Sequence, residues 1–255
     1  VLSAFIGPSL ASFIRDLIGG FPLAGSSARL SVIYILSILL ASRLQIAAPT
    51  ENERHGPQRP LRQIASQPAF VVAVLSATVA YGVMNLLMTS TPLAMAGCGH
   101  SFSDTALVIE WHVLAMFTPS FFTGSVINRF GTLRVMGTGA VILFASVAVN
   151  LSGTSVPHFV AALILVGIGW NFLFVGATSL VTESYSVPEK AKTQGLNDLI
   201  IFTTVAFTAV SSGIIHELAG WEMLNMMVLP AIALALAAIV WFGYRCGRDW
   251  RVNTA

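Results

Sequence analysis

Eight apolar stretches, each about long enough to cross a lipid bilayer, occupy most of this 255-residue chain. A membrane-spanning helix needs about 20 consecutive, mostly apolar residues. The composition agrees, because 55% of the residues are hydrophobic and only 9% are charged, whereas a soluble domain carries about a quarter charged residues. The sequence therefore predicts an all-α polytopic membrane protein with eight transmembrane helices, over residues 1–17, 24–42, 69–94, 106–127, 133–151, 157–180, 199–215 and 223–243.

The basic residues fall in alternate gaps between these stretches. Eleven of the thirteen Lys and Arg follow the second, fourth, sixth or eighth stretch, and only Arg15 and Arg29 lie elsewhere. Because loops rich in Lys and Arg stay on the cytoplasmic side, we expect those loops and the C-terminus inside the cell and Cys98 outside. The net charge of +2 is spread over loops that face lipid headgroups, so it does not indicate nucleic-acid binding.

A short repeat indicates how the chain is organised. The pattern of residues 14–19, Ile-Arg-Asp-Leu-Ile-Gly, reappears over residues 215–220 as Ile-His-Glu-Leu-Ala-Gly. Such a repeat is expected when two halves are related by an axis normal to the membrane. Because the chain opens inside an apolar stretch, we expect it to be a fragment. Its predicted parts are the last two transmembrane helices of the N-terminal half (1–44), a cytoplasmic linker (45–68), a six-helix C-terminal half (69–243) and a cytoplasmic tail (244–255). Within the linker, residues 60–65 fit either one turn of an interfacial helix or a flexible segment.

The loop after the fourth stretch, residues 124–134, reads Gly-Ser-Val-Ile-Asn-Arg-Phe-Gly-Thr-Leu-Arg. Gly124 is expected to let two helices approach closely, Gly131 to permit a tight turn, and Arg129 to bond carbonyls at a helix C-terminus. The motif resembles the inner-loop signature of the major facilitator superfamily, G-x-x-x-D-R-x-G-R-[RK], with Asn128 in place of Asp and a Thr in place of the next Arg. The resemblance implies a conformational gate loop that steadies the outward-facing state, formed by Gly124, Asn128, Arg129, Gly131 and Arg134.

Other segments resemble the same superfamily, and in particular a bacterial branch that includes riboflavin importers. Residues 182–192 resemble the inner loop after its tenth helix, and residues 84–89, 110–114 and 195–198 resemble that branch. The resemblance implies that the chain corresponds to helices 5–12 of a twelve-helix secondary transporter in the bacterial inner membrane. The implied function is alternating-access transport of a small organic solute, either a flat riboflavin-like molecule or a drug. We expect such a protein to be a monomer when full length.

Two ionisable residues lie well inside the fourth stretch. Glu110 and His112 are two positions apart, about 200° around a helix, so they cannot share one face. Ionisable residues inside a membrane usually face a cavity or a partner, and a carboxyl group in such a cavity suits a proton carrier. Glu110 therefore either carries protons and contacts the solute or bonds a neighbouring helix, and His112 either takes part in proton coupling or is a packed, hydrogen-bonded histidine. Asp198, by contrast, is expected to lie at a helix start.

Polar and aromatic side chains on three other stretches are candidates for solute binding. Tyr81 and Asn85 lie on a polar stripe of the third stretch, which either lines the cavity or bonds a neighbouring helix. Trp170 and Asn171 in the sixth stretch combine a ring for stacking with an amide for hydrogen bonding, although Trp also occurs as mere bulk. Thr204 in the seventh stretch either contacts the solute or bonds its own backbone.

Motifs for enzyme chemistry are missing from this sequence. It contains no H-E-x-x-H, no paired metal-binding cysteines, no phosphate-binding G-x-x-x-x-G-K and no G-x-S-x-G. We therefore expect no enzymatic activity, no metal and no cofactor. The alternatives are an intramembrane hydrolase that uses Glu110 with His112, which their 200° separation disfavours, and a membrane receptor or structural protein.

Overall fold

The computed structural model describes residues 34–35, 37–43 and 56–245. The chain divides into two compact units, Val1–Gly56 and Pro57–Ala255. In the first unit, residues 34–35 and 37–41 are helical. The predicted span over residues 1–17, most of the predicted span over residues 24–42 and most of the predicted tail lie outside the described residues.

Every regular element described in the second unit is a helix, as expected for a backbone that must satisfy its own hydrogen bonds inside lipid. A single turn of helix precedes the first long helix, and a 3-10 turn precedes the last one. The elements are α4 (Leu61–Ala65), α5 (Pro68–Gly97), α6 (Phe102–Phe117), α7 (Ser120–Phe130), α8 (Thr132–Ser152), α9 (Val156–Thr182), η1 (Val187–Glu189) and α10 (Lys190–Arg245).

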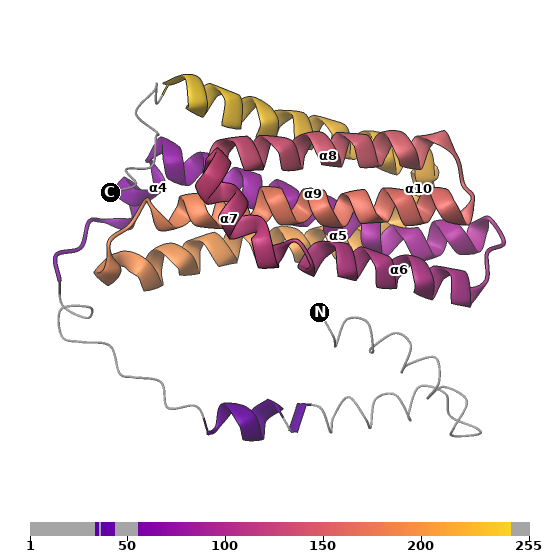
Figure 1. Ribbon diagram of the computed structural model, residues 1–255, viewed down its shortest axis with the longest axis horizontal. Helices are drawn as coiled ribbons and strands as arrows, with labels where there is room; N and C mark the ends of the chain where they lie inside the picture. Colours follow the sequence, from indigo (N-terminus) through magenta and orange to yellow (C-terminus); the bar gives the residue numbers. More distant parts are fainter. Residues whose placement is uncertain (1–33, 36, 44–55, 246–255) are drawn as a thin grey trace. The chain divides into compact units, whose positions relative to one another are not determined.

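The helices run back and forth between two ends of one bundle (Figure 1). The helix α4, the α7–α8 turn, η1 and the last turn of α10 lie at the same end, which we call the basic end. The α5–α6 and α8–α9 connections lie at the opposite end. All basic residues described in this unit belong to elements or turns at the basic end: Arg59, Arg62, Arg129, Arg134, Lys190, Lys192 and Arg245.

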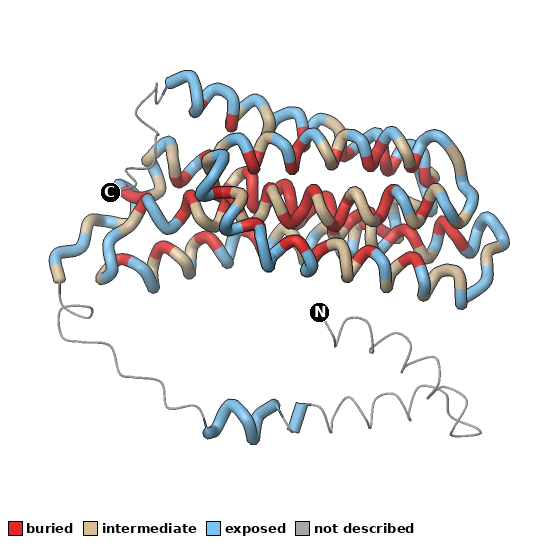
Figure 2. The backbone as a smooth tube through the Cα atoms, viewed as in Figure 1, coloured by how far each residue is buried: buried red, intermediate tan, exposed pale blue. Residues whose placement is uncertain are grey.

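The helices α5 and α9 occupy the centre of the bundle. Of the most apolar 18 residues, 72% are buried in α5 and 56% in α9, compared with 33% in the segment that contains α10. Figure 2 shows the same contrast between the buried middle helices and the exposed outer faces. Large apolar side chains such as Phe207 and Leu218 are 73% and 83% exposed. An apolar outer surface is what a lipid-embedded bundle requires.

Glycines bring α8 and α9 into backbone contact. A Cβ atom added to Gly139 of α8 would lie 2.5 Å from the backbone nitrogen of Leu173 on α9. A Cβ atom added to Gly169 of α9 would lie 2.9 Å from the side chain of Leu143 on α8. Small residues at such positions let membrane helices approach closely enough for extensive van der Waals contact. The α8–α9 pair is therefore held together by backbone surfaces that tolerate no added side chain.

The structure corrects two predicted boundaries. The fourth stretch is not one straight span, because α6 and α7 meet at a bend of 42°. Pro119, the N-cap residue of α7, has no backbone N–H, and its ring clashes with the preceding turn, so the helix bends there although Thr118 and Pro119 keep helical φ and ψ angles. The seventh stretch begins earlier than predicted, because α10 starts at Lys190. Asp198 therefore lies about two turns inside α10 rather than at a helix start.

The number of spans is smaller in the described residues than the sequence predicts. Four helices (α5, α8, α9 and α10 with η1) are long and apolar enough to cross a membrane, and the bent α6–α7 pair adds a fifth. Eight transmembrane helices are therefore not shown. The 56 residues of α10 would extend about 84 Å as one straight helix, although the hydrocarbon core is only about 30 Å thick. The backbone leaves the helical conformation at Gly220, with φ 78° and ψ 173°, and the chain reverses direction there (Figure 1).

A network of polar contacts joins the segment before α5 to the loop between α9 and α10. The Arg59 backbone N–H donates to Glu189 Oε1 at 2.7 Å, and Arg59 Nη2 donates to Glu189 Oε2 at 2.7 Å and to the Ser184 carbonyl at 3.0 Å. Lys192 Nζ donates to the Arg59 carbonyl at 2.6 Å. The hydrogen bonds from the Arg59 side chain and the Ser186 backbone N–H hold the pKa of Glu189 well below its usual range. We call this set of contacts the Arg59 junction.

The helix α4 decides between the two alternatives for residues 60–65. Leu61–Ala65 is helical, which confirms the single-turn prediction, and Ile64 is fully buried. The described part of the predicted linker is thus bonded to the bundle through α4 and the Arg59 junction.

Candidate solute site

Aromatic rings from four helices meet inside the bundle. The rings of Trp170 and Phe174 are stacked, with centroids 5.0 Å apart and planes 10° apart, because residues four apart share one face of a helix. Tyr81 lies edge-on to both rings, at 5.5 and 5.3 Å. Phe117 lies 6.3 Å from Trp170, and Phe202 lies 6.2 Å from Tyr81. We call these five residues the aromatic cluster: Tyr81 of α5, Phe117 of α6, Trp170 and Phe174 of α9, and Phe202 of α10.

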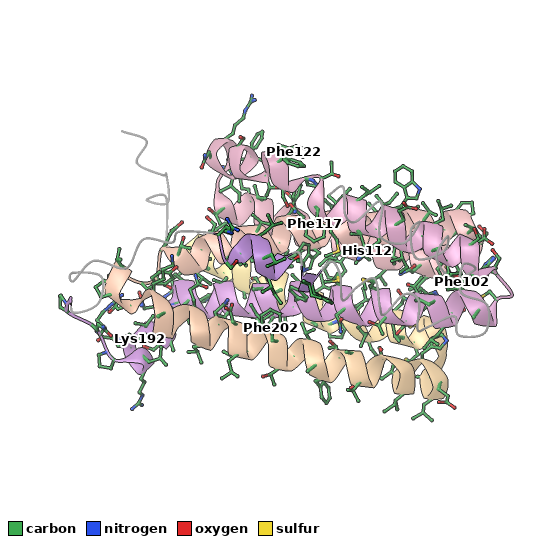
Figure 3. The ribbon with its side chains drawn as sticks, turned by 90° about the horizontal axis from the view of Figure 1, so that it is seen from below. Phe102, His112, Phe117, Phe122, Lys192 and Phe202 are labelled. Carbon is green, nitrogen blue, oxygen red and sulfur yellow. The ribbon has the colours of Figure 1, made fainter. Side chains whose placement is uncertain are left out.

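The aromatic cluster combines a buried centre with exposed edges. Trp170 is only 6% exposed, whereas Phe117 is 43% and Phe202 is 57% exposed. Figure 3 places Phe117 and Phe202 between the two ends of the bundle, which Lys192 and Phe102 mark. Partly exposed rings at this depth offer stacking faces and edges to a flat ligand. Stacking of one base on an aromatic side chain is worth about 1–3 kcal/mol, so such a platform can contribute substantially to affinity.

Trp170 also carries an unused hydrogen-bond donor. Its indole Nε1 is buried and has no acceptor among residues 56–245. A buried donor without an acceptor costs about 1–3 kcal/mol. An acceptor atom at the edge of a bound ring would remove this cost if a small movement brought it within reach. The aromatic cluster can therefore favour a ring that carries oxygen or nitrogen acceptors.

Asn85 and Thr204 lie on the helices that contribute Tyr81 and Phe202, but their polar groups bond helices. Asn85 Nδ2 donates to the Val205 carbonyl at 3.2 Å and to Thr208 Oγ1 at 2.9 Å, which links α5 to α10. Thr204 Oγ1 donates to the Ile200 carbonyl of its own helix at 3.0 Å. In this conformation Asn85 bonds a neighbouring helix and Thr204 bonds its own backbone, as one of the two alternatives for each residue predicted. Contact of either residue with a solute stays a prediction.

Glu110 and His112 differ in burial. His112 is fully buried, with Nδ1 2.8 Å from the Leu163 carbonyl of α9. Because a carbonyl oxygen only accepts, Nδ1 carries the hydrogen and Nε2 is left as an acceptor, with no partner in the described part of the chain. Glu110 is half-buried and lies seven residues before Phe117, on the same stripe of α6. Proton coupling through either residue stays a prediction.

Asn171 is fully buried, and its amide is engaged with the α6–α7 bend. Asn171 Nδ2 donates to the Met116 carbonyl at 2.7 Å and to Ser120 Oγ at 2.6 Å. Its Oδ1 lies 2.7 Å from the hydroxyl of Thr123 on α7. Both amide hydrogens are thus in use, so Asn171 has no free donor for a solute in this conformation. Solute contact by Asn171 remains a prediction.

The gate loop lies at the basic end and is helical except at Gly131, which alone forms the turn between α7 and α8. Gly131 confirms the predicted tight turn, because its φ of 89° favours glycine and one residue separates the two helices. The described residues show no close helix contact at Gly124, since a Cβ atom there would meet nothing within 4 Å, and the predicted contact stays a prediction. The reason is the bend at Pro119, after which α7 buries only Thr123 and Ile127.

The predicted bonding of Arg129 to helix carbonyls is not seen among the described residues and stays a prediction. Its guanidinium instead lies 5.4 Å from the ring centroid of Phe130, and none of the described residues accepts a hydrogen bond from it. Asn128 and Arg129 at the end of α7 and Arg134 in the first turn of α8 are exposed in the described part of the chain. Their role as a gate stays a prediction.

Three members of the aromatic cluster were not predicted as site residues. Phe174 lies one turn after Trp170, and Phe117 lies on the same stripe as Glu110, so helical spacing alone could have found both. Phe202 shares its helix with the exposed Phe207, and only its tertiary contact with Tyr81 singles it out.

Comparison with known proteins identifies the family. Residues 75–253 match the Major Facilitator Superfamily. The riboflavin transporter RfnT of Brucella anthropi is 40% identical over 242 residues, which cover 94% of this chain and 61% of that protein. The MFS-type transporter YdeG of Bacillus subtilis is 32% identical over 256 residues, which cover 93% of this chain and 59% of that protein. The methylenomycin A resistance protein of Bacillus subtilis is 23% identical over 187 residues, which cover 72% of this chain and 38% of that protein.

The chain thus spans about three-fifths of the length of the riboflavin transporter and of YdeG. The family match begins inside α5 and continues past the end of α10, so it includes every helix that contributes to the aromatic cluster. The helices that it covers are long and apolar enough for a multi-pass membrane protein. The chain belongs to the major facilitator superfamily, a family of membrane transporters rather than enzymes.

Proposed function

We propose that the full-length protein is a secondary active transporter that moves a flat aromatic solute, such as riboflavin, by alternating access. The observation that carries this proposal is the aromatic cluster, in which a stacked Trp170–Phe174 pair lies among rings from three other helices. The isoalloxazine ring of riboflavin is flat and carries oxygen and nitrogen acceptors at its edge. Such a ring matches both the stacking surfaces and the unused indole N–H of Trp170. The similarity to a protein named as a riboflavin transporter supports the same solute class.

The arrangement of this half also supports alternating access. If the reversal at Gly220 divides α10 into two spans, the second unit has six spans: α5, the α6–α7 pair, α8, α9 and the two parts of α10. The aromatic cluster would then face a second half that completes the site. Proton coupling would use Glu110, because it shares a stripe of α6 with Phe117 of the cluster.

An uptake assay tests the proposed solute. The full-length protein is reconstituted in proteoliposomes, and the initial rate of radiolabelled riboflavin uptake is measured at subsaturating concentration. We expect Trp170→Ala to lower this rate at least about tenfold, because it removes the buried ring that holds Phe174, Tyr81 and Phe117 in place and the unused indole N–H. Trp241→Ala is the matched control, because Trp241 is 47% exposed and its ring faces Arg245 at 5.2 Å, away from the cluster. We expect the control to stay within about twofold of wild type.

Two results would contradict the proposed solute. If the wild-type protein transports the antibiotic methylenomycin but not riboflavin, the solute is a drug and not the vitamin. Equal uptake rates for Trp170→Ala and wild type would show that the aromatic cluster is not the solute site.

The orientation is a second proposal, with the basic end in the cytoplasm of a bacterium. Lys and Arg at one end of the bundle support it. Cys98 is exposed in the connection at the opposite end. A membrane-impermeant maleimide added to intact cells should therefore label Cys98 and spare Cys246. Labelling of Cys246 alone would reverse the orientation.

A further inference from the structure

The bend between α6 and α7 leaves a gap in the backbone hydrogen bonding that a side chain of α9 fills. The helix α6 ends at Phe117, and the bond from the Ser120 N–H to the Met116 carbonyl that an unbroken helix would make is missing across the bend at Pro119. The carbonyl of Met116, in this last turn, accepts from Asn171 Nδ2 at 2.7 Å. A buried carbonyl without a partner is costly inside a membrane. Asn171 therefore takes the place of a backbone donor that the bend removes.

The same amide also holds the start of α7. Asn171 Nδ2 donates to Ser120 Oγ at 2.6 Å. The Thr123 hydroxyl lies 2.7 Å from Asn171 Oδ1 and 2.8 Å from the Pro119 carbonyl. Its single hydrogen is shared between these two acceptors. One fully buried side chain thus contacts the last turn of α6 and the first turn of α7.

Few other contacts hold α7 in place. Only Thr123 and Ile127 of this helix are buried, and Phe121 and Phe122 are 79% and 49% exposed. A Cβ atom at Gly124 would meet nothing within 4 Å. Among the described elements, the position of α7 therefore depends on hydrogen bonds to Asn171, whereas the position of α8 depends on close backbone packing.

We propose that Asn171 is a positioning residue that holds α7 against α9 and couples the aromatic cluster to the gate loop. Trp170 and Asn171 are adjacent in one turn of α9, so a solute that shifts the α9 backbone at Trp170 also shifts the Asn171 amide. Its hydrogen bonds of 2.6–2.7 Å weaken when a movement of about 1 Å takes them past about 3.5 Å. Release of Ser120 and Thr123 would let α7 pivot at Pro119 and displace the turn at Gly131. The coupling to solute rests on the proposed function, whereas the hold on α7 does not.

A cysteine reporter on α7 tests the hold without any solute. Ile127→Cys places a thiol at a position that is 8% exposed. The full-length protein is studied in inside-out membrane vesicles with an impermeant maleimide, and labelling at position 127 is quantified by peptide mass spectrometry. We expect Asn171→Leu, which keeps a similar volume but no hydrogen bond, to raise the labelling rate about threefold to tenfold. Ser120→Ala removes one of the contacts and should raise it by a smaller factor.

Asn150→Leu is the matched control for the loss of a buried amide. Asn150 is also buried, and its Nδ2 donates to Asn225 Oδ1 at 2.8 Å across α8 and α10. We expect it to leave labelling at position 127 unchanged. Unchanged labelling in both Asn171→Leu and Ser120→Ala would overturn the proposal, as would an equal rise in Asn150→Leu. If Asn171→Leu does not accumulate in the membrane, Ser120→Ala alone decides.

Riboflavin added to the same vesicles tests the coupling. In protein that binds riboflavin, saturating riboflavin should change the labelling of the wild-type reporter, and Asn171→Leu should abolish that change. Riboflavin binding with no change in labelling would overturn the coupling. Absence of riboflavin binding would contradict the proposed function and leave the hold on α7 to be decided by the solute-free labelling rates.

Discussion

The helices α7 and α8 both pack against α9, but they do so in opposite ways. The helix α8 meets α9 backbone to backbone, and a Cβ atom at Gly139 would lie 2.5 Å from Leu173 N. The helix α7 carries a glycine as well, but a Cβ atom at Gly124 would have no neighbour within 4 Å. Polar contacts to Asn171 hold α7 instead. A glycine thus lies at a close helix contact in α8 and on an unpacked face in α7.

If Asn171 holds α7 as proposed, this difference divides the bundle into a fixed part and a part that can move. Close-packed interfaces are bistable or rigid rather than continuously deformable, so α8 and α9 should move as one body. A helix held by a few hydrogen bonds can be released when their geometry changes. The aromatic cluster lies on the side of α9 that faces α5, α6 and α10, and Asn171 follows Trp170 directly.

The largest effect should come from filling the α8–α9 contact. Gly139→Leu would place a side chain against the backbone of α9, and overpacking of this kind typically costs about 1–3 kcal/mol, occasionally more. We expect little folded protein and a markedly lower midpoint of thermal unfolding in detergent. Gly124→Leu is the control, because the described residues leave space there. A thermal midpoint for Gly139→Leu equal to that of Gly124→Leu would contradict the contrast between α8 and α7.

A second effect should appear in α6, which leads into α7, in the coupling to protons. Glu110→Gln removes a titrating group while nearly preserving its shape and hydrogen-bonding capacity. In proteoliposomes we expect this variant to lose riboflavin accumulation driven by a pH gradient and to retain exchange of internal for external solute. Normal gradient-driven accumulation in Glu110→Gln would show that the carboxyl group only bonds a neighbouring helix.

The smallest effect should come from the Arg59 junction, which fastens the segment before α5 to the end of α9. The folded-state pKa of Glu189 is lowered by Arg59 and Ser186, so the stabilisation is present above the ordinary glutamate pKa of about 4.3. It is lost as the pH falls below that value towards the folded-state pKa. We expect amide hydrogen exchange over residues 57–67, corrected for its intrinsic pH dependence, to become faster below about pH 4.

Two variants sharpen this measurement. Arg59→Ala should exchange fast in the same segment already at neutral pH and depend less on pH. Arg62→Ala is the control, because Arg62 is exposed in the neighbouring helix α4. Wild-type protection that does not change on acidification would show that the ion pair does not hold the segment.

Long apolar helices were predictable from the sequence, whereas their breaks were less so. The prediction over residues 157–180 agrees with α9, Val156–Thr182, and the prediction over residues 133–151 agrees with α8, because apolar length alone sets both. The bend at Pro119 lies inside a continuous apolar stretch, so hydropathy does not reveal it. The extension of α10 back to Lys190 uses polar residues, which hydropathy assigns to a loop.

The candidate site was only partly predictable, for a related reason. Tyr81 and Trp170 were predicted, because a ring inside a span has few uses besides packing and binding. The partners of Asn171 lie 48–55 residues away along the chain, and the Arg59–Glu189 pair is 130 residues apart. No helical spacing connects such residues, so only the packing of the helices shows which role each one has.

Equilibrium binding of riboflavin to the full-length protein tests the central claim most directly, namely that the aromatic cluster around Trp170 binds the solute. Riboflavin fluorescence is titrated with detergent-solubilised wild-type protein, Trp170→Ala and Trp241→Ala. We expect saturable quenching in wild type and Trp241→Ala, with a dissociation constant at least about tenfold higher in Trp170→Ala. Equal dissociation constants for wild type and Trp170→Ala would contradict solute binding by the aromatic cluster.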